Sequence, residues 1–259
     1  MKNFLSIYKN CVKYAFAGAI AYRLNFILTL ISALCFYAVF PLVTVLVYSA
    51  GASFPGWDLY EVLLIQSIFI LSSGLCDLLI NGVLWSTMDY IRNGSYEVIL
   101  LKPMSPLVYL GLTSFNPECV SMIIGGSVLF WVSIARTETT ANMIFQFPPL
   151  FAAGVAVMTG GLLIVSATSF KWVGNSRIIE IYDSIMTFGK YPVNIFPQAL
   201  RTFLTFIVPA SMIGHYPAAA LLDRGSLSAF FAVIPCYLFM LFGVWLYMHM
   251  IKLYEGVGG

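Results

Sequence analysis

Four polar side chains recur at helical spacing within an apolar part of the chain, and they are the first candidates for chemistry. They are Arg177, Glu180, Asp183 and Ser184. Positions three and four residues apart share one face of an α-helix, so the four form a stripe. In a membrane, such a stripe is tolerated only toward the interior of a bundle or a pore. The spacing therefore predicts a helix that lines a translocation path or relays protons or ions.

A further carboxylate, Glu118, follows Asn116-Pro117 inside the apolar segment 107–134. A charge at mid-membrane costs about 2.5 kcal/mol or more. Three interpretations are open: Glu118 faces the path, stays protonated against a neighbouring helix, or bonds backbone that Pro117 leaves unpaired. Asp77, near the end of another apolar segment, is expected to pair locally or to cap the adjoining loop.

The chain lacks the residue sets that define hydrolases and metal centres. No H-E-x-x-H or G-x-S-x-G motif is present, and neither the five cysteines nor the two histidines have ligand spacing. The G-x-x-x-x-G-K-[ST] phosphate loop is also missing, so the chain is not expected to bind ATP by that route. We expect no enzyme activity and no metal site.

The elements that must position the candidates are membrane-spanning helices. Apolar residues make up 60% of the 259 residues and charged ones 9%, with mean hydropathy +0.90, whereas soluble domains carry about 25% charged residues. A span needs about 20 apolar residues. We expect an all-α membrane protein, with a single transmembrane domain over 1–259. Five of its spans are predicted at 24–48, 62–84, 107–134, 144–170 and 227–251.

A sixth span has two possible positions between Lys171 and Gly225. The segment 174–190 carries the polar stripe, whereas 193–222 is more apolar but contains Arg201 and three prolines. Hydropathy favours 193–222 as the crossing. The other segment is then interfacial or re-entrant, because irregular backbone at membrane depth must be buried in protein or line a cavity.

The basic residues predict that both termini are cytoplasmic. Eight Lys and Arg residues fall on the cytoplasmic side in this orientation and two, Arg136 and Arg224, on the other, with Arg177, Lys190 and Arg201 left out because they lie between 171 and 225. Residues 1–22 mix apolar positions with three lysines, which predicts an interfacial helix on the inner leaflet or, alternatively, a frayed basic tail. The expected location is the plasma (inner) membrane, and no basic tract indicates a nucleic-acid partner.

The predicted cytoplasmic loop 85–104 is more apolar than a connector requires. Asn93-Gly94 indicates a turn, and Ser95 can cap a short helix that runs to Leu101 before Pro103 ends it. Such a helix either docks into a groove on a partner or lies on its own bundle, and its spacing leaves both open.

Three motifs, in this order along the chain, resemble ABC type-2 exporter permeases of the six-span, multidrug-like subgroup. They are Tyr22-Arg23-x-Asn25-Phe26, then Ile91-Arg92-x-Gly94-x-x-Glu97-x-x-Leu100-Leu101-Lys102-Pro103, then Phe188-Gly189-Lys190-Tyr191-Pro192-x-x-Ile195-Phe196-Pro197.

The resemblance implies a six-span subunit of an ATP-driven exporter, with an interfacial N-terminal helix and a cytoplasmic coupling helix. It also assigns the fifth crossing to 174–190 and a re-entrant outer element to 193–222, and we adopt this because of the polar stripe. ATP and Mg²⁺ would be held by a separate dimer of ABC ATPase subunits, with a second, identical or homologous permease completing the path. The implied coupling residues are Asp89, Arg92, Gly94, Glu97, Leu100 and Leu101.

The alternative is a secondary transporter or channel that uses the intramembrane acidic residues. No inverted repeat is visible, and the polar residues lie at unrelated depths, which argues against it. The cargo is not readable: 16% aromatic residues suit a hydrophobic drug or lipid and equally suit ordinary membrane packing.

Overall fold

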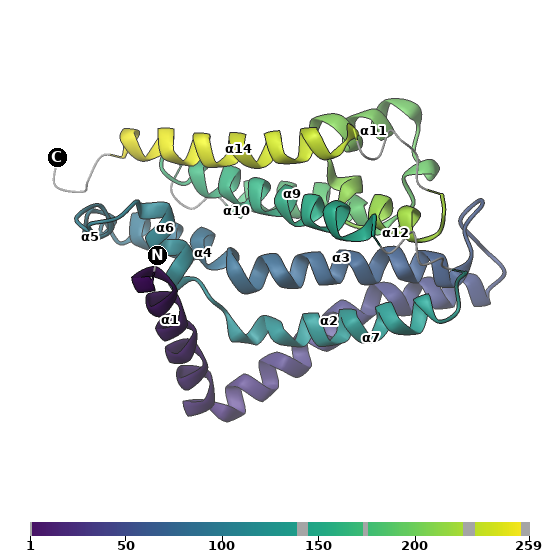
Figure 1. Cartoon of the computed structure of the whole chain (residues 1–259), viewed down its shortest axis with the longest axis horizontal. Coiled ribbons are helices and arrows are strands. Elements are labelled where there is room, and N and C mark those ends of the chain that lie inside the picture. The colour runs from purple at the N-terminus through teal and green to yellow at the C-terminus, as the bar shows by residue number, and fades with distance from the viewer. Residues whose placement is uncertain (1, 139–144, 173–175, 225–230, 255–259) are drawn as a thin grey trace.

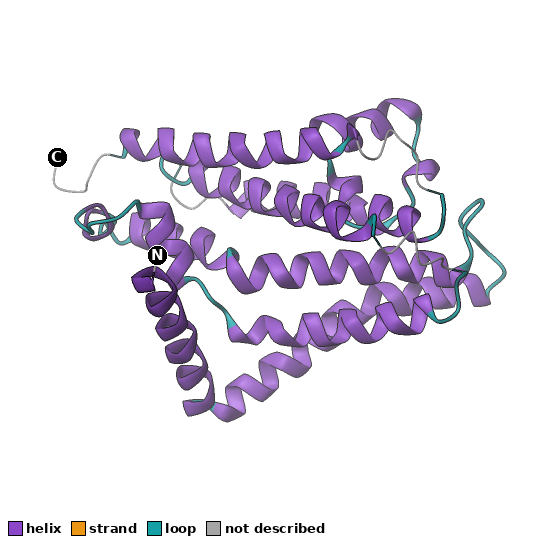
Figure 2. Ribbon diagram, viewed as in Figure 1, coloured by secondary structure: helices purple, strands orange, loops and turns teal. Residues whose placement is uncertain are grey.

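The computed structural model describes residues 2–138, 145–172, 176–224 and 231–254, and all regular structure in these ranges is helical (Figures 1 and 2). Five helices are long and apolar enough to cross a membrane: Arg23–Ser49 (α2), Leu59–Leu79 (α3), Pro117–Ile134 (η1 and α7), Phe147–Thr168 (α9) and Val233–Leu253 (α14 and η6). The expected all-α class is confirmed. The predicted segment starts at 144, 174 and 227 lie outside the described residues.

The long helices pack as neighbours along the long axis of the molecule. In Figure 1, α3, α9 and α14 run side by side, and α7 contacts both α2 and α3. One end gathers α4 (Asn81–Arg92), α5 (Glu97–Leu100), α6 (Pro106–Thr113) and the last turns of α14. The other end holds the α2–α3 loop, α11 (Gln198–Thr202) and α12 (His215–Leu221).

Glycines set the closest approach, between α9 and α14. A Cβ placed on Gly160 would lie 2.7 Å from Cα of Met240, and one on Gly243 would lie 2.5 Å from the carbonyl oxygen of Gly160. Small residues permit such backbone contact between helices in lipid, where van der Waals packing replaces the hydrophobic driving force. The pair α9 and α14 therefore packs backbone to backbone.

The N-terminal segment is a helix, α1 (Lys2–Ala21), rather than a frayed tail. It runs across the direction of α3 in Figure 1 and contacts α2, α6 and η1.

Two of the expected spans are corrected at the end of the molecule that carries α5. The predicted helix 62–84 ends at Leu79, and α4 begins at Asn81 after a break at Ile80. The predicted helix 107–134 is divided into α6 and a crossing helix that starts at Pro117.

Proline chemistry and local hydrogen bonds explain the second break. Pro117 has no N–H to donate, and Asn116 caps the new helix because its Oδ1 accepts the Glu118 N–H at 3.0 Å. The Asn116 N–H itself donates to the carbonyl of Leu78 at 3.0 Å. The loop between α6 and the crossing helix is thereby fixed against the end of α3.

The segment between the fourth and last crossing helices is a chain of short helical pieces. It begins with α10 (Ser176–Thr187) and η2 (Phe188–Lys190), and α10 packs on α9, where the Tyr182 hydroxyl donates to the carbonyl of Met158 at 3.2 Å. Residues 193–222 form η3 (Val193–Ile195), α11, a π-helical turn (Phe203–Ile207), η5 (Ala210–Met212) and α12. This stretch is not the single crossing helix that hydropathy favours, and α10 is not among the five long apolar helices.

Candidate functional site

The loop expected to face a partner folds as a turn and one short helix. Gly94 has φ +64°, in the left-handed region that favours glycine, and lets the chain reverse after α4. Ser95 does not cap the next helix as predicted, because its hydroxyl donates to the carbonyl of Tyr90 at 3.4 Å. The helix that follows, α5, covers Glu97–Leu100.

The short helix α5 has two faces of opposite exposure. Ile99 and the preceding Tyr96 are buried in the bundle, whereas Val98, Leu100 and Leu101 are exposed, Leu101 to 84%. We call these three exposed residues the α5 apolar surface. One face of the loop therefore packs on the bundle, and the other is exposed.

The remaining coupling candidates surround this surface. Glu97 is exposed beside it, and Asp89 and Arg92 are exposed on α4. None of them takes part in an ion pair within the described part of the chain, where the ion pair found joins Glu61 and Arg224.

A cluster of buried aromatic residues lies beneath α5, and sequence reasoning did not identify it. The Tyr247 hydroxyl of α14 is 2.7 Å from the Thr87 hydroxyl of α4 and 3.1 Å from that of Tyr96. Phe170, just after α9, contacts the Tyr96 ring edge-on with ring centroids 5.0 Å apart. Burial raises the pKa of Tyr96 above its usual value, so this hydroxyl keeps its proton and can donate. The cluster connects α5 to the ends of α4, α9 and α14.

The polar stripe lies on the exposed face of α10, and one of its members also lines a cavity. Arg177, Glu180 and Ser184 are exposed on α10, and the Ser184 hydroxyl donates to the carbonyl of Glu180 at 2.7 Å. Asp183 is exposed as well, and it lines a cavity of about 390 Å³ between α2, α3, α9 and α10. Asp77 of α3 and Lys190 line the same cavity, so Asp77 faces an internal space rather than pairing in the adjoining loop.

Glu118 lies apart from the stripe. The sequence predicted a position inside a span, but Glu118 lies at the start of one. It belongs to the first turn of the crossing helix that begins at Pro117, and it lines a pocket of about 420 Å³ against α1 and the start of α2. The other walls of this pocket include Tyr14, Tyr22 and Phe26. The structure therefore does not bring Glu118 together with Asp183.

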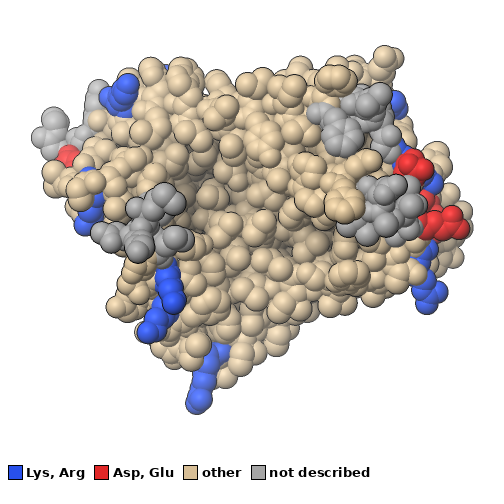
Figure 3. Space-filling view, in the orientation of Figure 1, with Lys and Arg blue, Asp and Glu red and all other residues tan. Residues whose placement is uncertain are grey.

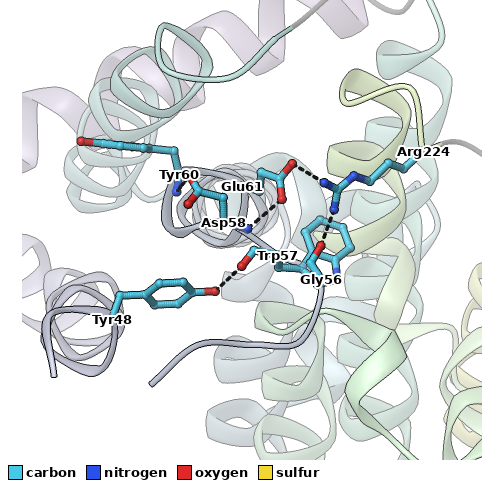
Figure 4. Close-up of polar contacts among 7 residues, drawn as sticks. All are labelled: Tyr48, Gly56, Trp57, Asp58, Tyr60, Glu61 and Arg224. Carbon is cyan, nitrogen blue, oxygen red and sulfur yellow. Dashed lines mark hydrogen bonds and ion pairs between the residues drawn. The ribbon is translucent and has the colours of Figure 1, made fainter. Parts of the chain in front are cut away.

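The opposite end of the molecule is tied together by one arginine (Figure 4). Arg224 pairs with Glu61 of α3 at 2.6 Å and donates to the carbonyl of Gly56 at 2.8 Å. Its guanidinium also lies over the Trp57 ring, 4.9 Å from the centroid. The Tyr48 hydroxyl donates to the carbonyl of Trp57 at 2.8 Å, so α2, the α2–α3 loop and the end of the 193–222 stretch are held together.

Charge gathers at the two ends of the molecule on the face seen in Figure 3, with a broad uncharged band between them. Together with five long apolar helices, this defines an all-helical, multi-pass membrane protein. The family model described as ABC-2 family transporter protein matches residues 34–258, so the chain belongs to this family of ABC transporter permeases. The resemblance to ABC type-2 permeases noted in the sequence is confirmed. No curated protein matches the chain. Permeases of this family are the membrane components of their transporters and are not themselves the ATPases.

Proposed function

We propose that this chain forms the translocation path of an ATP-driven exporter together with a second permease, and that separate ATPase subunits dock on the α5 apolar surface. The observation that carries the proposal is the pairing of that exposed surface with the buried aromatic cluster beneath it. Exposed apolar groups such as Val98, Leu100 and Leu101 mark contacts with another protein or with a membrane, and the proposal assigns this one to the ATPase subunit.

The buried cluster supports a mechanical role for the surface. Because Tyr96 leads directly into α5 and bonds Tyr247, a displacement of α5 is transmitted to α14 and, through Phe170, to the end of α9. Cargo binding alone cannot drive export, since a ligand shifts a conformational equilibrium only by its differential affinity for the two states. The ATP cycle of the partner supplies the bias, and ATP and Mg²⁺ are held by that partner.

A second permease fits the uneven burial of the crossing helices. In the most apolar window, 72% of the residues are buried for α3 and for α9 but only 11% for α2. The side of the molecule that carries α2 is therefore free to face lipid or a second permease. In this proposal the α5 end is cytoplasmic, α10 with η2 is the fifth crossing, and 193–222 is the re-entrant outer element of a protein of the plasma membrane.

Purification in mild detergent, followed by reconstitution into liposomes, tests the proposal. The wild-type chain is expected to bring an ATPase subunit with it and to support transport that depends on ATP. Leu101→Asp, which places a charge at the most exposed position of the α5 apolar surface, and Glu97→Lys are each expected to lower ATPase retention or ATP-driven transport by about tenfold, the loss that 1.4 kcal/mol of binding represents.

The matched control is Val108→Asp, the same kind of change at an exposed apolar position of α6. It is expected to keep wild-type retention. Equal retention in Leu101→Asp and wild type would contradict the docking assignment. Transport that follows a proton gradient and ignores ATP would instead identify a secondary transporter.

A further inference from the structure

The cavity between α2, α3, α9 and α10 is lined by charged side chains and by aromatic rings. Asp77 and Asp183 contribute carboxylates from two different helices, and Lys190 contributes one ammonium. No ion pair within the described residues joins Lys190 to either carboxylate. Two acidic groups thus share the space with one basic group, and ionisation of all three leaves one negative charge in excess.

The excess charge calls for a cation because of where the cavity lies. A carboxylate inside the hydrocarbon region costs about 2.5–3.5 kcal/mol on insertion scales, and such residues pair with a partner or mark a substrate path. One monovalent cation between Asp77 and Asp183 balances the cavity.

Lys190 shows how the aromatic walls receive a positive charge. Its Nζ lies 3.6 Å from the centroid of the Phe40 ring and 5.0 Å from that of Phe69, although the residue is 9% exposed. Cations over aromatic faces gain about 2 kcal/mol where they are desolvated. Further rings line the same cavity, from Phe36 and Tyr37 of α2 and Trp85 of α4. They offer the same kind of contact to a ligand.

We propose that this cavity binds an amphipathic molecule with a single positive charge and bulky apolar substituents. The charge lies between Asp77 and Asp183, and the apolar groups lie against Phe36, Tyr37 and Trp85. The volume of about 390 Å³ is within the range of small-molecule sites. The inference rests on the proposed transport function and gives the cargo class. A free lipophilic cation and the amine headgroup of a membrane lipid share this chemistry.

The test is equilibrium binding of tetraphenylphosphonium to the purified full-length chain in nanodiscs made of phosphatidylglycerol, whose headgroup carries neither an amine nor an ammonium group. Tetraphenylborate, an anion of the same shape, is the matched ligand. The cation is expected to bind at least about tenfold more tightly than the anion after correction for empty nanodiscs. This comparison needs no variant, so it remains decisive if a substitution impairs folding.

Variants then locate the bound charge. Asp77→Asn and Asp183→Asn are each expected to weaken tetraphenylphosphonium binding by about tenfold, and Trp85→Leu by about fivefold. Glu180→Gln is the matched control, since Glu180 is an exposed carboxylate of the same helix and does not line the cavity. It should bind like wild type.

Three results would overturn the proposal: equal binding of cation and anion, unchanged binding in Asp77→Asn and Asp183→Asn, or an equal loss in Glu180→Gln. Phosphatidylethanolamine added to the nanodiscs separates the two sources, because displacement assigns the site to a lipid amine and retention assigns it to a free cation. The binding assay contains no ATPase. If tetraphenylphosphonium does not bind but the chain still retains an ATPase subunit, only the proposed cargo class is contradicted. If tetraphenylphosphonium binds but no ATPase subunit is retained, only the proposed coupling to an ATPase is contradicted.

Discussion

The Tyr247 hydroxyl joins two groups that are remote from it along the chain, those of Thr87 and Tyr96. All three residues are buried, so each hydroxyl depends on the others for a hydrogen-bond partner. Removing a buried partner costs about 1–3 kcal/mol, because the desolvated group that is left behind has nothing to bond.

Tyr247→Phe keeps the ring and removes only this hydroxyl. We expect the free energy of unfolding to fall by about 1–3 kcal/mol, and ATP hydrolysis in the assembled transporter to continue with less cargo moved per ATP. Thermal denaturation in detergent and the ratio of transport to hydrolysis measure the two effects. Tyr237→Phe makes the same change at an exposed tyrosine of α14 and should alter neither. An unchanged ratio in Tyr247→Phe would remove this hydroxyl from the coupling route.

At the scale of elements, the contact between α9 and α14 leaves no room for a side chain on the shared glycine face. Gly160 and Gly243 meet through their backbones, so the spacing between the two helices is set by the absence of Cβ atoms. A larger residue at either glycine has to move the two backbones apart at this contact.

Gly160→Leu is therefore expected to destabilise the protein by about 1–3 kcal/mol or more through overpacking. Gly111→Leu is the control, because a Cβ at Gly111 of α6 meets nothing within 4 Å. Thermal stability in detergent compares the two. Equal melting of both variants would show that α9 and α14 can separate without loss.

The sequence predicts the long helices well and their interruptions poorly, for a physical reason. Apolar length is a local property, so the segments 24–48, 144–170 and 227–251 each overlap a crossing helix. The breaks at Ile80 and at 114–116 depend on contacts between distant residues, such as the Asn116 N–H on the Leu78 carbonyl. The shared cavity of Asp77 and Asp183 has the same origin, since only packing places α3 beside α10.

At the scale of the whole molecule, the proposed topology places the α5 end in the cytoplasm and Arg224 at the outer face. The position of the turn after η2 bears on whether α10 with η2 is the fifth crossing. Tyr191 contacts Phe54 of the α2–α3 loop, with ring centroids 6.0 Å apart, so the chain has reached the end of the molecule opposite α5. If α10 with η2 crosses, Asn194 lies outside.

Single cysteines placed in a chain cleared of its five native cysteines decide this arrangement. Asn194→Cys and Ala52→Cys, both at exposed positions, should react with a membrane-impermeant maleimide in intact cells. Asn93→Cys, exposed after α4, should react only after permeabilisation. Labelling of Asn194→Cys solely after permeabilisation would place it with Asn93 and exclude α10 as a crossing helix.

The packing of Tyr182 on Gly161 bears on how the chain enters the membrane during synthesis. A Cβ at Gly161 would collide with the Tyr182 ring, so α10 fits against α9 only at this glycine. Alone, α10 carries Arg177, Glu180 and Asp183, and each charge adds about 2.5–3.5 kcal/mol at the centre of a helix that inserts by itself. Its apolar neighbour α9 is made immediately before it and already presents the glycine surface. If α10 crosses as proposed, the two helices are suited to leave the translocon as one hairpin, in which the apolar helix lowers the cost of inserting the polar one.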